Sequence, residues 1–250
     1  YFFDPAFPKP LPNKWKIGGV MGLSIGKDDD VWAYNRPNDL TNIELEAELN
    51  PPVAECCVTP PSMIHFDKNG TVIGSFNAPQ GHGMDVDSKG VVWTPLSSGA
   101  YASFDRSKCK GPLNGPKATG DQCPEGWQFF QYPGPGFKGI GENSAESSYY
   151  TWVDQHNVFG LGENIPMSTA NLNDGFVALK DGKMVMIRIP YPMGFYAKGF
   201  DGRIDDPNAG WKGRGLWAAN GDRTPWLIEG GKGTKPLAAH FQLRPDPLAH

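Results

Sequence analysis

The chain has 250 residues, a formal net charge of −4 at pH 7, and 12% aromatic residues. No cluster of Lys and Arg stands out, which argues against a nucleic-acid partner, and no apolar run approaches the roughly 20 residues of a membrane-spanning helix. The 32 glycines and 24 prolines, together with the aromatic content, indicate an all-β chain of many short strands and turns rather than a disordered one.

The first elements are an extended arm and a hairpin. Residues 1–16 contain four prolines, so we expect them to form neither helix nor strand. A hairpin is predicted at 17–35, where an alternating apolar run leads through a polar turn to Val31-Trp32. The best helix candidate is 38–50, because residues that cap helices precede it and two prolines follow it.

Two kinds of hairpin then alternate along the chain. The first kind ends in Val-Trp and occurs at 19–32 and again at 81–93. The second kind has an Asp-Lys-Asn-Gly turn at 62–76, and it recurs at 101–132, with a delayed return strand, and at 176–189. Hairpins of the first kind begin near residues 19, 81, 149 and 213.

One hairpin of each kind supplies four antiparallel strands, which is the content of a propeller blade. We therefore predict an all-β fold, a β-propeller of about four blades with long inserted loops, rather than a flat β-sandwich of unrelated hairpins. Four blades is a low number for a closed ring. Three alternatives follow: the ring closes with four blades, the chain is part of a longer one, or a partner chain completes the ring. The expected units are residues 17–80, 81–145, 146–200 and 201–250.

The four cysteines indicate an oxidising compartment, and we expect a periplasmic or extracellular protein. Cys109 and Cys123 bracket a loop without hydrophobic pattern, where a disulfide would stabilise the fold by about 3 kcal/mol. The adjacent Cys56 and Cys57 form a vicinal disulfide, pair elsewhere, or stay as buried thiols. A zinc site is the alternative, but no Cys-x-x-Cys spacing is present.

Several segments resemble known propellers. The front half, at 7–37, 50–58 and 82–93, is similar to bacterial NHL-repeat propellers related to peptidylglycine amidating lyase. The back half, at 102–116 and 203–217, and also Gln242–Leu248, resembles secreted virginiamycin B (streptogramin) lyase-like proteins. These resemblances imply the propeller scaffold and do not by themselves imply the reaction.

The amidating-lyase resemblance implies two candidate catalytic residues. In that family three histidines, each in a motif like His-Gly-x-x-Val-Asp, hold zinc in the central channel. Here the motif occurs once, at His82, which is therefore the candidate metal ligand or base, or else a histidine bonded to a loop carbonyl. Arg36 matches an arginine of that family and would hold a carboxylate, unless it forms a surface salt bridge.

A polar loop in the last unit and the residues around it supply the candidate binding residues. We expect these residues either to line a ligand pocket or to act as an ion-paired strut between units. His65, on an outer strand beside Phe66, is expected to be structural. The candidate binding residues are Arg214, Arg223, Trp217 and Asp205.

These features predict a secreted or periplasmic propeller that acts as a scaffold. It would bind a small-molecule ligand or a partner protein, and it could be a subunit of an oligomer or larger assembly. The alternative is a metal-dependent lyase with its site in the central channel. The cofactor of such an enzyme would be a divalent metal, namely zinc, calcium or magnesium.

Overall fold

The computed structural model describes residues 4–77, 81–96, 99–112, 123–134, 148–190, 195–202, 215–220 and 237–243. Within these ranges the regular structure is β, apart from short 3-10 helices. No helix in the described part of the chain is long and apolar enough to cross a membrane. The 3-10 helices are η1 (Pro12–Lys14), η2 (Pro37–Asp39), η3 (Arg106–Lys108) and η4 (Pro124–Gly126).

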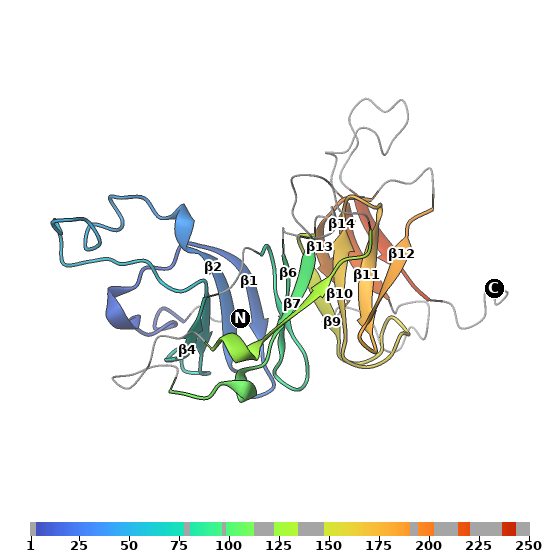
Figure 1. Cartoon of the computed structure of the whole chain (residues 1–250), viewed down its shortest axis with the longest axis horizontal. Helices are drawn as coiled ribbons and strands as arrows, with labels where there is room; N and C mark the ends of the chain where they lie inside the picture. The colour runs from blue at the N-terminus through green and yellow to red at the C-terminus, as the bar shows by residue number, and fades with distance from the viewer. Residues whose placement is uncertain are drawn as a thin grey trace, which may run out of the picture. The chain divides into compact units, whose positions relative to one another are not determined.

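The strands form four separate sheets, in each of which the strands are ordered as they follow one another along the chain (Figure 1). The first sheet contains β1 (Gly19–Ile25), β2 (Val31–Arg36), β3 (Met63–Phe66) and β4 (Val72–Phe76). The second contains β5 (Asp85–Val86), β6 (Val92–Leu96), β7 (Ala100–Phe104) and β8 (Trp127–Gln131). The third contains β9 (Thr151–Asp154), β10 (Ile165–Ala170), β11 (Gly175–Lys180) and β12 (Lys183–Arg188). The fourth contains β13 (Ala197–Asp201), β14 (Leu216–Asn220) and β15 (Leu237–Phe241).

Every strand pair with a described register is antiparallel. Four small antiparallel sheets with sequential strands are the blades that the alternating hairpins predicted. The predicted fold class, an all-β propeller of four recognisable blades, is therefore confirmed.

Turn chemistry accounts for the tight connections. Between β3 and β4 the Asp67 carboxylate accepts hydrogen bonds from the backbone N–H groups of Asn69 (2.9 Å) and Thr71 (2.8 Å). Gly70 adopts a φ of 82°, which a residue with a Cβ rarely takes. The turn thus fixes which residues of β3 and β4 face each other.

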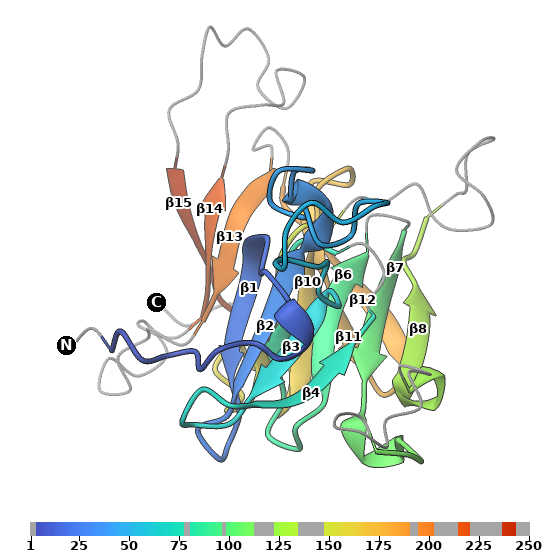
Figure 2. The ribbon, with the colours of Figure 1, turned by 90° about the vertical axis from the view of Figure 1, so that its left-hand side faces the viewer.

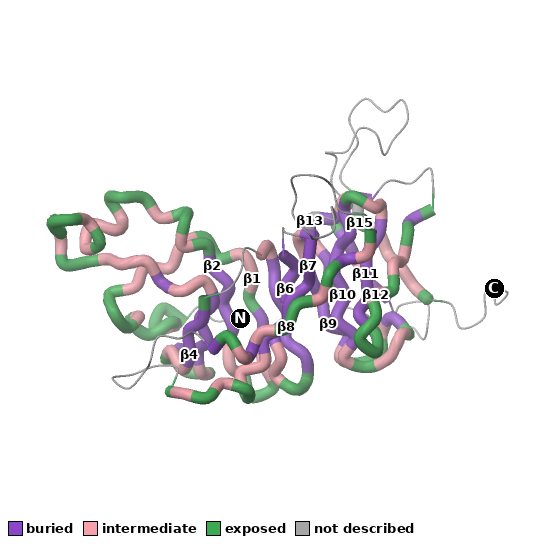
Figure 3. Tube along the Cα trace, in the orientation of Figure 1, coloured by how far each residue is buried: buried purple, intermediate pink, exposed green. Residues whose placement is uncertain are grey.

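The chain divides into two compact units. Unit 1 comprises Tyr1–Pro79, Lys89–Val91 and Phe104–Gln128, and unit 2 comprises Gln80–Ser88, Val92–Ser103 and Phe129–His250. In Figure 3 the strands of both units are mostly buried, whereas the connecting segments are mostly exposed or half-buried.

The first sheet has an apolar layer on each face. On one face the N-terminal arm, which crosses in front of the sheet in Figure 2, packs its apolar side chains against Ala33, Ile64 and Phe66. On the other face Phe76 lies between Trp32, at 5.8 Å between ring centroids, and Phe104, at 4.4 Å. Two-sided burial of this kind holds a small sheet in a fixed shape.

The core of unit 2 is centred on Phe176, a fully buried residue of β11. The centroid of its ring lies within 6.5 Å of the ring centroids of four other phenylalanines. These partners come from segments far apart in the chain, so the cluster joins the third and fourth sheets. They are Phe159, Phe195, Phe200 and Phe241.

Three sequence expectations differ from the structure. No α-helix forms at 38–50, where only η2 and isolated turns are found. The strand that returns from β9 is β10 (Ile165–Ala170), not the segment that ends at Leu161. The last hairpin was expected to begin near residue 213, but it is made by β13 and β14 and therefore begins at Ala197. The strand β13, most of which lies within the expected third unit, thus belongs to the fourth sheet.

Candidate functional site

Unit 1 contains a pocket with a volume of about 250 Å³, lined by described residues. Trp32 on β2 and His65 on β3 contribute side chains to it. The rest of the lining comes from the β1–β2 turn and from the segments 89–90 and 105–107. The pocket therefore lies at the turn end of the first sheet.

Strand register brings the two aromatic residues together. Trp32 and His65 are directly opposite each other in the β2–β3 ladder, so their side chains emerge on the same face of the sheet. Their rings stack with 3.8 Å between centroids and 13° between planes. Both are almost fully buried, at 2% and 5% exposure.

Asp30, at the end of the β1–β2 turn, holds both rings. Its Oδ2 atom accepts a hydrogen bond from the Trp32 indole Nε1–H (3.0 Å) and is also bonded to Nε2 of His65. Gly26 makes room for this carboxylate, because a Cβ at Gly26 would lie 2.2 Å from Oδ1 of Asp30. The turn sequence thus positions the acid, and the acid orients the imidazole.

The charges of this pair follow from their surroundings. Burial lowers the pKa of His65, since it disfavours the imidazolium, and the positive charge of Arg106 adds to this against the opposing effect of Asp30. Burial raises the pKa of Asp30, but its hydrogen bond and charge interaction with His65 outweigh burial and bring the pKa below its ordinary value. At neutral pH, Asp30 is a carboxylate and His65 is a neutral imidazole.

A neutral His65 that donates its Nε2 proton to Asp30 has a lone pair on Nδ1. That Nδ1 atom is buried and has no hydrogen-bond partner among the described residues. A buried acceptor without a partner costs about 1–3 kcal/mol. The atom has almost no solvent-accessible surface, so it is closed off from the solvent that fills the pocket.

Arg106 brings a cation to the same face of the sheet. Its Nη2 donates to the carbonyl of Ile73 on β4 (2.7 Å). Gly74 lies opposite His65 in the β3–β4 ladder, and its missing side chain makes room mainly for the Phe76 ring, since a Cβ there would lie 3.0 Å from Cζ of Phe76 and at an ordinary 3.5 Å from Nε of Arg106. The Nε atom is buried without a partner in the described part of the structure.

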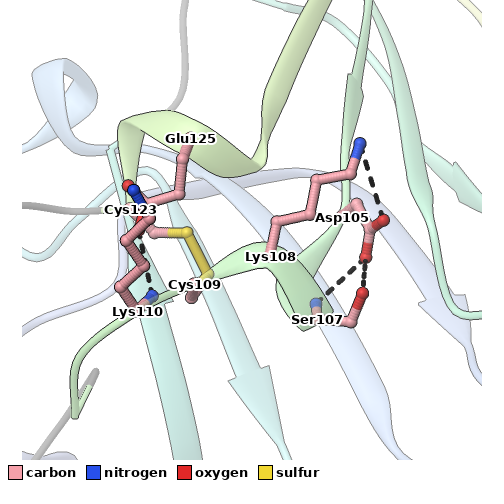
Figure 4. Close-up of a disulfide and its surroundings, with 7 residues drawn as sticks. All are labelled: Asp105, Ser107, Lys108, Cys109, Lys110, Cys123 and Glu125. Carbon is pink, nitrogen blue, oxygen red and sulfur yellow. Dashed lines mark hydrogen bonds and ion pairs between the residues drawn. A yellow bond between two sulfur atoms is a disulfide. The ribbon is translucent and has the colours of Figure 1, made fainter.

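The segment that carries Arg106 is fixed on both sides (Figure 4). Asp105 caps η3, accepting from the backbone N–H (3.0 Å) and the hydroxyl (2.6 Å) of Ser107. Immediately after η3, Cys109 is disulfide-bonded to Cys123. These links hold the start of η3 beside the pocket.

The other two cysteines, Cys56 and Cys57, form a disulfide with each other. Of the possibilities that the sequence left open, the structure therefore has the vicinal disulfide. All four cysteines of the chain are paired.

His82, the candidate base and metal ligand, lies in unit 2 just before β5. Its ring meets the ring of Tyr149 edge-on, with 4.6 Å between centroids, and Tyr149 in turn contacts Tyr196 at 5.8 Å. These three aromatic residues precede β5, β9 and β13, which are the first strands of three successive sheets.

The described residues contain no group of three or more His, Cys, Asp or Glu side chains that could hold a metal ion. The described residues therefore supply no companion ligands for a zinc, calcium or magnesium centre at His82. The role of His82 as a metal ligand or base stays a prediction, and we derive no step through a metal.

Arg36, the other candidate catalytic residue, lies at the end of β2 in unit 1. Its side chain is 49% exposed and forms an ion pair with Asp39 (3.4 Å) within the same turn. A second nitrogen of the guanidinium lies 3.6 Å from the sulfur of Met21. The structure thus shows the surface salt bridge that was the alternative to a carboxylate-binding role.

Of the four candidate binding residues, only Trp217 lies in the described part of the chain. It is in β14 and stacks on His240 of β15, with 4.2 Å between centroids and 10° between planes. The other three, Arg214, Arg223 and Asp205, lie outside the described residues.

Solved structures with similar folds include virginiamycin B lyase from Staphylococcus aureus, a protein of unknown function from Bacteroides caccae and a protein from Lactobacillus plantarum. For the lyase the identity is 12%, the TM-score is 0.39, and the match covers 92% of this chain and 71% of the lyase. For the Bacteroides protein the identity is 12%, the TM-score is 0.47, and the match covers 88% of this chain and 63% of that protein. For the Lactobacillus protein the identity is 10%, the TM-score is 0.44, and the match covers 80% of this chain and 48% of that protein.

The virginiamycin B lyase that the sequence resemblance named is thus among the solved structures similar to this chain, while the likeness to amidating lyases stays a prediction. The chain spans less than two thirds of the length of the Bacteroides protein. No protein-family model matches the chain, and no curated protein matches it in sequence.

Proposed function

We propose that this chain is a ligand-binding β-propeller that works outside the cytoplasm, in the periplasm or the extracellular space. Its binding site is the pocket of unit 1 that contains His65. The single observation that carries the proposal is the pocket itself, a hollow of about 250 Å³ that is lined by His65, by the Asp30 that holds it and by Arg106. The paired cysteines support an oxidising compartment.

The arrangement has the properties of a binding site rather than of a packing defect. Asp30 fixes the imidazole, Trp32 stacks on it, and Arg106 is anchored to the backbone of β4. A few fixed polar groups in a concave site are what gives a ligand its orientation. The pocket lining is therefore rigid before a ligand arrives, which reduces the entropy lost on binding.

A ligand-detected NMR screen tests the proposal. The probes are a fragment library that covers acids, amines, polyols and aromatic compounds, applied to the wild type and to His65→Phe. We expect a group of fragments whose saturation-transfer signal is lost in His65→Phe but kept in His240→Phe, which removes the imidazole from the similar Trp217–His240 stack. A screen in which no signal depends on His65 contradicts the proposed site.

A protein-binding role is a second candidate, and an exposed apolar row on β1 favours it. Val20, Leu23 and Ile25 are 49%, 63% and 54% exposed. They pair with alternate residues of β2, so they share one face of the sheet. Grouped apolar side chains on a surface are typical of a contact with another protein.

We propose that this row takes part in an assembly, either with a second copy or with another protein. Sedimentation of the wild type is compared with that of a Leu23→Asp, Ile25→Asp double variant. Val53→Asp is the matched control, because Val53 is equally exposed, at 66%, on a different segment. Assembly should be lost in the double variant alone, and a wild type that is monomeric at every concentration speaks against self-association.

A further inference from the structure

We infer that the adjacent pair Cys56–Cys57 is a site of reversible thiol–disulfide exchange, and that its reduction loosens the contact between the N-terminal arm and the segment 53–60. The inference goes beyond the proposed function, because none of the residues involved lines the pocket of unit 1. It rests on the exposure of the pair, on the adjacency of the two cysteines, and on the hydrogen bonds that lie next to them.

The two disulfides of the chain differ in their exposure. Cys56 is exposed and Cys57 is half-buried, whereas Cys109 is half-buried and Cys123 is only 1% exposed. A thiol reacts with a disulfide only where it can reach one of the sulfur atoms, and exposed disulfides are the labile ones in proteins. The Cys56–Cys57 pair is therefore the one that an external thiol reaches first.

The Cys56–Cys57 bond contributes little as a cross-link. The stabilisation that a disulfide gives by restricting the unfolded chain grows with the length of the loop that it closes. Cys109 and Cys123 are separated by 14 positions, whereas Cys56 and Cys57 are directly adjacent and connect no distant segments. For the same reason the two thiols stay side by side after reduction, so the bond re-forms without the entropy cost of closing a loop.

The exchange with a dithiol takes two steps. A thiolate of the dithiol attacks Sγ of Cys56, which forms a mixed disulfide and releases Sγ of Cys57 as a thiolate. The second thiolate of the dithiol then attacks the dithiol sulfur of the mixed disulfide and releases Cys56. Two electrons pass from the dithiol to the protein, the dithiol leaves as a disulfide, and its two protons end on Cys56 and Cys57.

The pair adjoins a contact that holds the N-terminal arm. Val58 forms a parallel bridge with Trp15. The N–H of Val58 donates to the carbonyl of Lys14 (2.9 Å), and the N–H of Lys16 donates to the carbonyl of Val58 (3.2 Å). Opening the disulfide returns rotational freedom to the backbone directly before Val58, and this freedom must be lost again for the bridge to form. Reduction should therefore weaken these two hydrogen bonds.

The expected change is confined to a short stretch of the arm. Phe7, Leu11 and Ile17 pack against the apolar cluster of the first sheet, and they lie on both sides of the bridge at Trp15 along the chain. These apolar contacts do not involve the disulfide, so they keep the arm on the sheet when the bridge opens. Reduction thus acts as a local switch at Trp15 and Val58 rather than as a step of unfolding.

The first test compares the reduction of the two disulfides in the folded protein. The wild type is incubated with graded concentrations of dithiothreitol, free thiols are trapped with N-ethylmaleimide, and peptide mass spectrometry counts the labels on each cysteine. We expect Cys56 and Cys57 to be labelled at dithiothreitol concentrations at least about tenfold lower than those needed for Cys109 and Cys123. Oxidised glutathione added before trapping should restore the Cys56–Cys57 bond.

The second test measures hydrogen exchange of the peptides that contain Lys16 and Val58. It compares the oxidised wild type, the wild type reduced only at Cys56–Cys57, and a Cys56→Ser, Cys57→Ser double variant. We expect exchange at least about tenfold faster in the last two, and no change in a peptide that contains Asp105, from another part of unit 1. If the double variant fails to fold, the selectively reduced wild type still decides the test.

Each result bears on the inference. Selective labelling of Cys56 and Cys57 together with faster exchange supports it. Labelling of both disulfides at the same dithiothreitol concentrations, or of Cys109 and Cys123 first, overturns the exchange site. Unchanged exchange of the Lys16 and Val58 peptides after selective reduction overturns the link to the arm.

Discussion

The geometry of the pocket depends on the carboxylate of Asp30, and the substitution Asp30→Ala tests this dependence. The substitution removes the acceptor of two N–H groups, Nε1 of Trp32 and Nε2 of His65, which belong to side chains only 2% and 5% exposed. Leaving a buried donor without a partner costs about 1–3 kcal/mol. Because the Asp30 side chain is itself 19% exposed, water can replace part of the loss, and we expect a net destabilisation of about 2–4 kcal/mol.

Urea unfolding, followed by circular dichroism and tryptophan fluorescence and fitted with two transitions where needed, measures this loss. Asp30→Asn retains an amide oxygen for one of the two donors, so it should cost about half as much, roughly 1–2 kcal/mol. Asp28→Ala, an exposed position in the same turn, should change stability by less than about 0.5 kcal/mol. If Asp30→Ala is as mild as Asp28→Ala, Asp30 does not hold the two rings.

The remaining predictions concern pH, the disulfide and metal. Because burial lowers the pKa of His65, the unfolded chain binds a proton on this residue more readily than the folded chain does. The free energy of unfolding should therefore fall as the pH drops below about 6.5, by at most about 1.4 kcal/mol per pH unit. This loss should be missing from His65→Phe, and equal pH profiles of the wild type and His65→Phe contradict it. A second loss, below about pH 4, belongs to the carboxylates whose pKa is lowered in the folded chain, which are Asp30, Glu44, Asp67 and Asp105. Reduction should add two hydrogen atoms, that is two electrons and two protons, to the peptide pair that contains Cys109 and Cys123, as mass spectrometry can show. Cys109→Ser should cost about 3 kcal/mol for a closed loop of this length. His82→Ala should lower stability by no more than about 1 kcal/mol, because it removes one edge-to-face ring contact. If the lyase hypothesis holds, the same substitution should also abolish the metal content measured by elemental analysis. Metal that persists in the variant excludes His82 as its ligand.

The strands could be predicted from the sequence because their signals are local. The Asp-Lys-Asn-Gly turn at Asp67–Gly70 fixes a hairpin with its own hydrogen bonds and one left-handed glycine, so no distant contact is needed to recognise it. The delayed strand β8 was found for a similar reason, since its aromatic run stands out between turn residues. Local chemistry of this kind gave the number and the order of the sheets.

The expected helix at 38–50 failed because its capping signal was real but its periodicity was not helical. Thr41 and Glu44 form a capping pair, in which the Glu44 carboxylate accepts from the backbone N–H and the hydroxyl of Thr41, each at 3.0 Å. Beyond it, however, apolar residues alternate with glutamates at every second position. Such a segment has no apolar helix face to bury, and Glu48 instead bonds the hydroxyl of Thr59 (2.8 Å).

No strand was predicted at Ile165–Ala170, a segment that contains a proline. Pro166 cannot donate to a ladder, and prolines are uncommon in central strands. In the structure Pro166 is the second residue of the strand, where it pairs with Val153 of β9 and lies outside the described register with β11. Its missing N–H therefore interrupts no hydrogen bond of that register.

The pocket could not be read from the sequence because its parts meet only in three dimensions. His65 is 35 residues from Asp30, and Arg106 reaches it from the far side of β4. Taken alone, a histidine beside Phe66 on a strand is indistinguishable from a packed core residue. The one available signal was a tryptophan preceded by an aspartate, at Asp30–Trp32, with a histidine on the strand predicted to pair with it.

Comparison between the sheets separates what belongs to the scaffold from what belongs to the site. A tryptophan lies against an aromatic ring of the next strand in three sheets: Trp32 on His65, Trp93 beside Tyr101 (5.6 Å), and Trp217 on His240. In the second sheet an aspartate also holds the indole, since Nε1 of Trp93 donates to Asp87 (3.2 Å).

The tryptophan–ring pair is therefore part of how three of the four sheets pack, and its presence says little about function. What the first sheet adds is a second use of the aspartate, which here binds the histidine as well as the indole, and a nearby arginine that is bonded to the carbonyl of Ile73. These additions cost stability, because they leave two buried polar atoms without partners among the described residues. In the fourth sheet His240 likewise stacks an imidazole on Trp217, and its Nε2 atom is also buried without a partner among the described residues. What sets the first sheet apart is therefore the joint presence of Asp30, His65 and Arg106 at a pocket, rather than the unpartnered nitrogen of the imidazole.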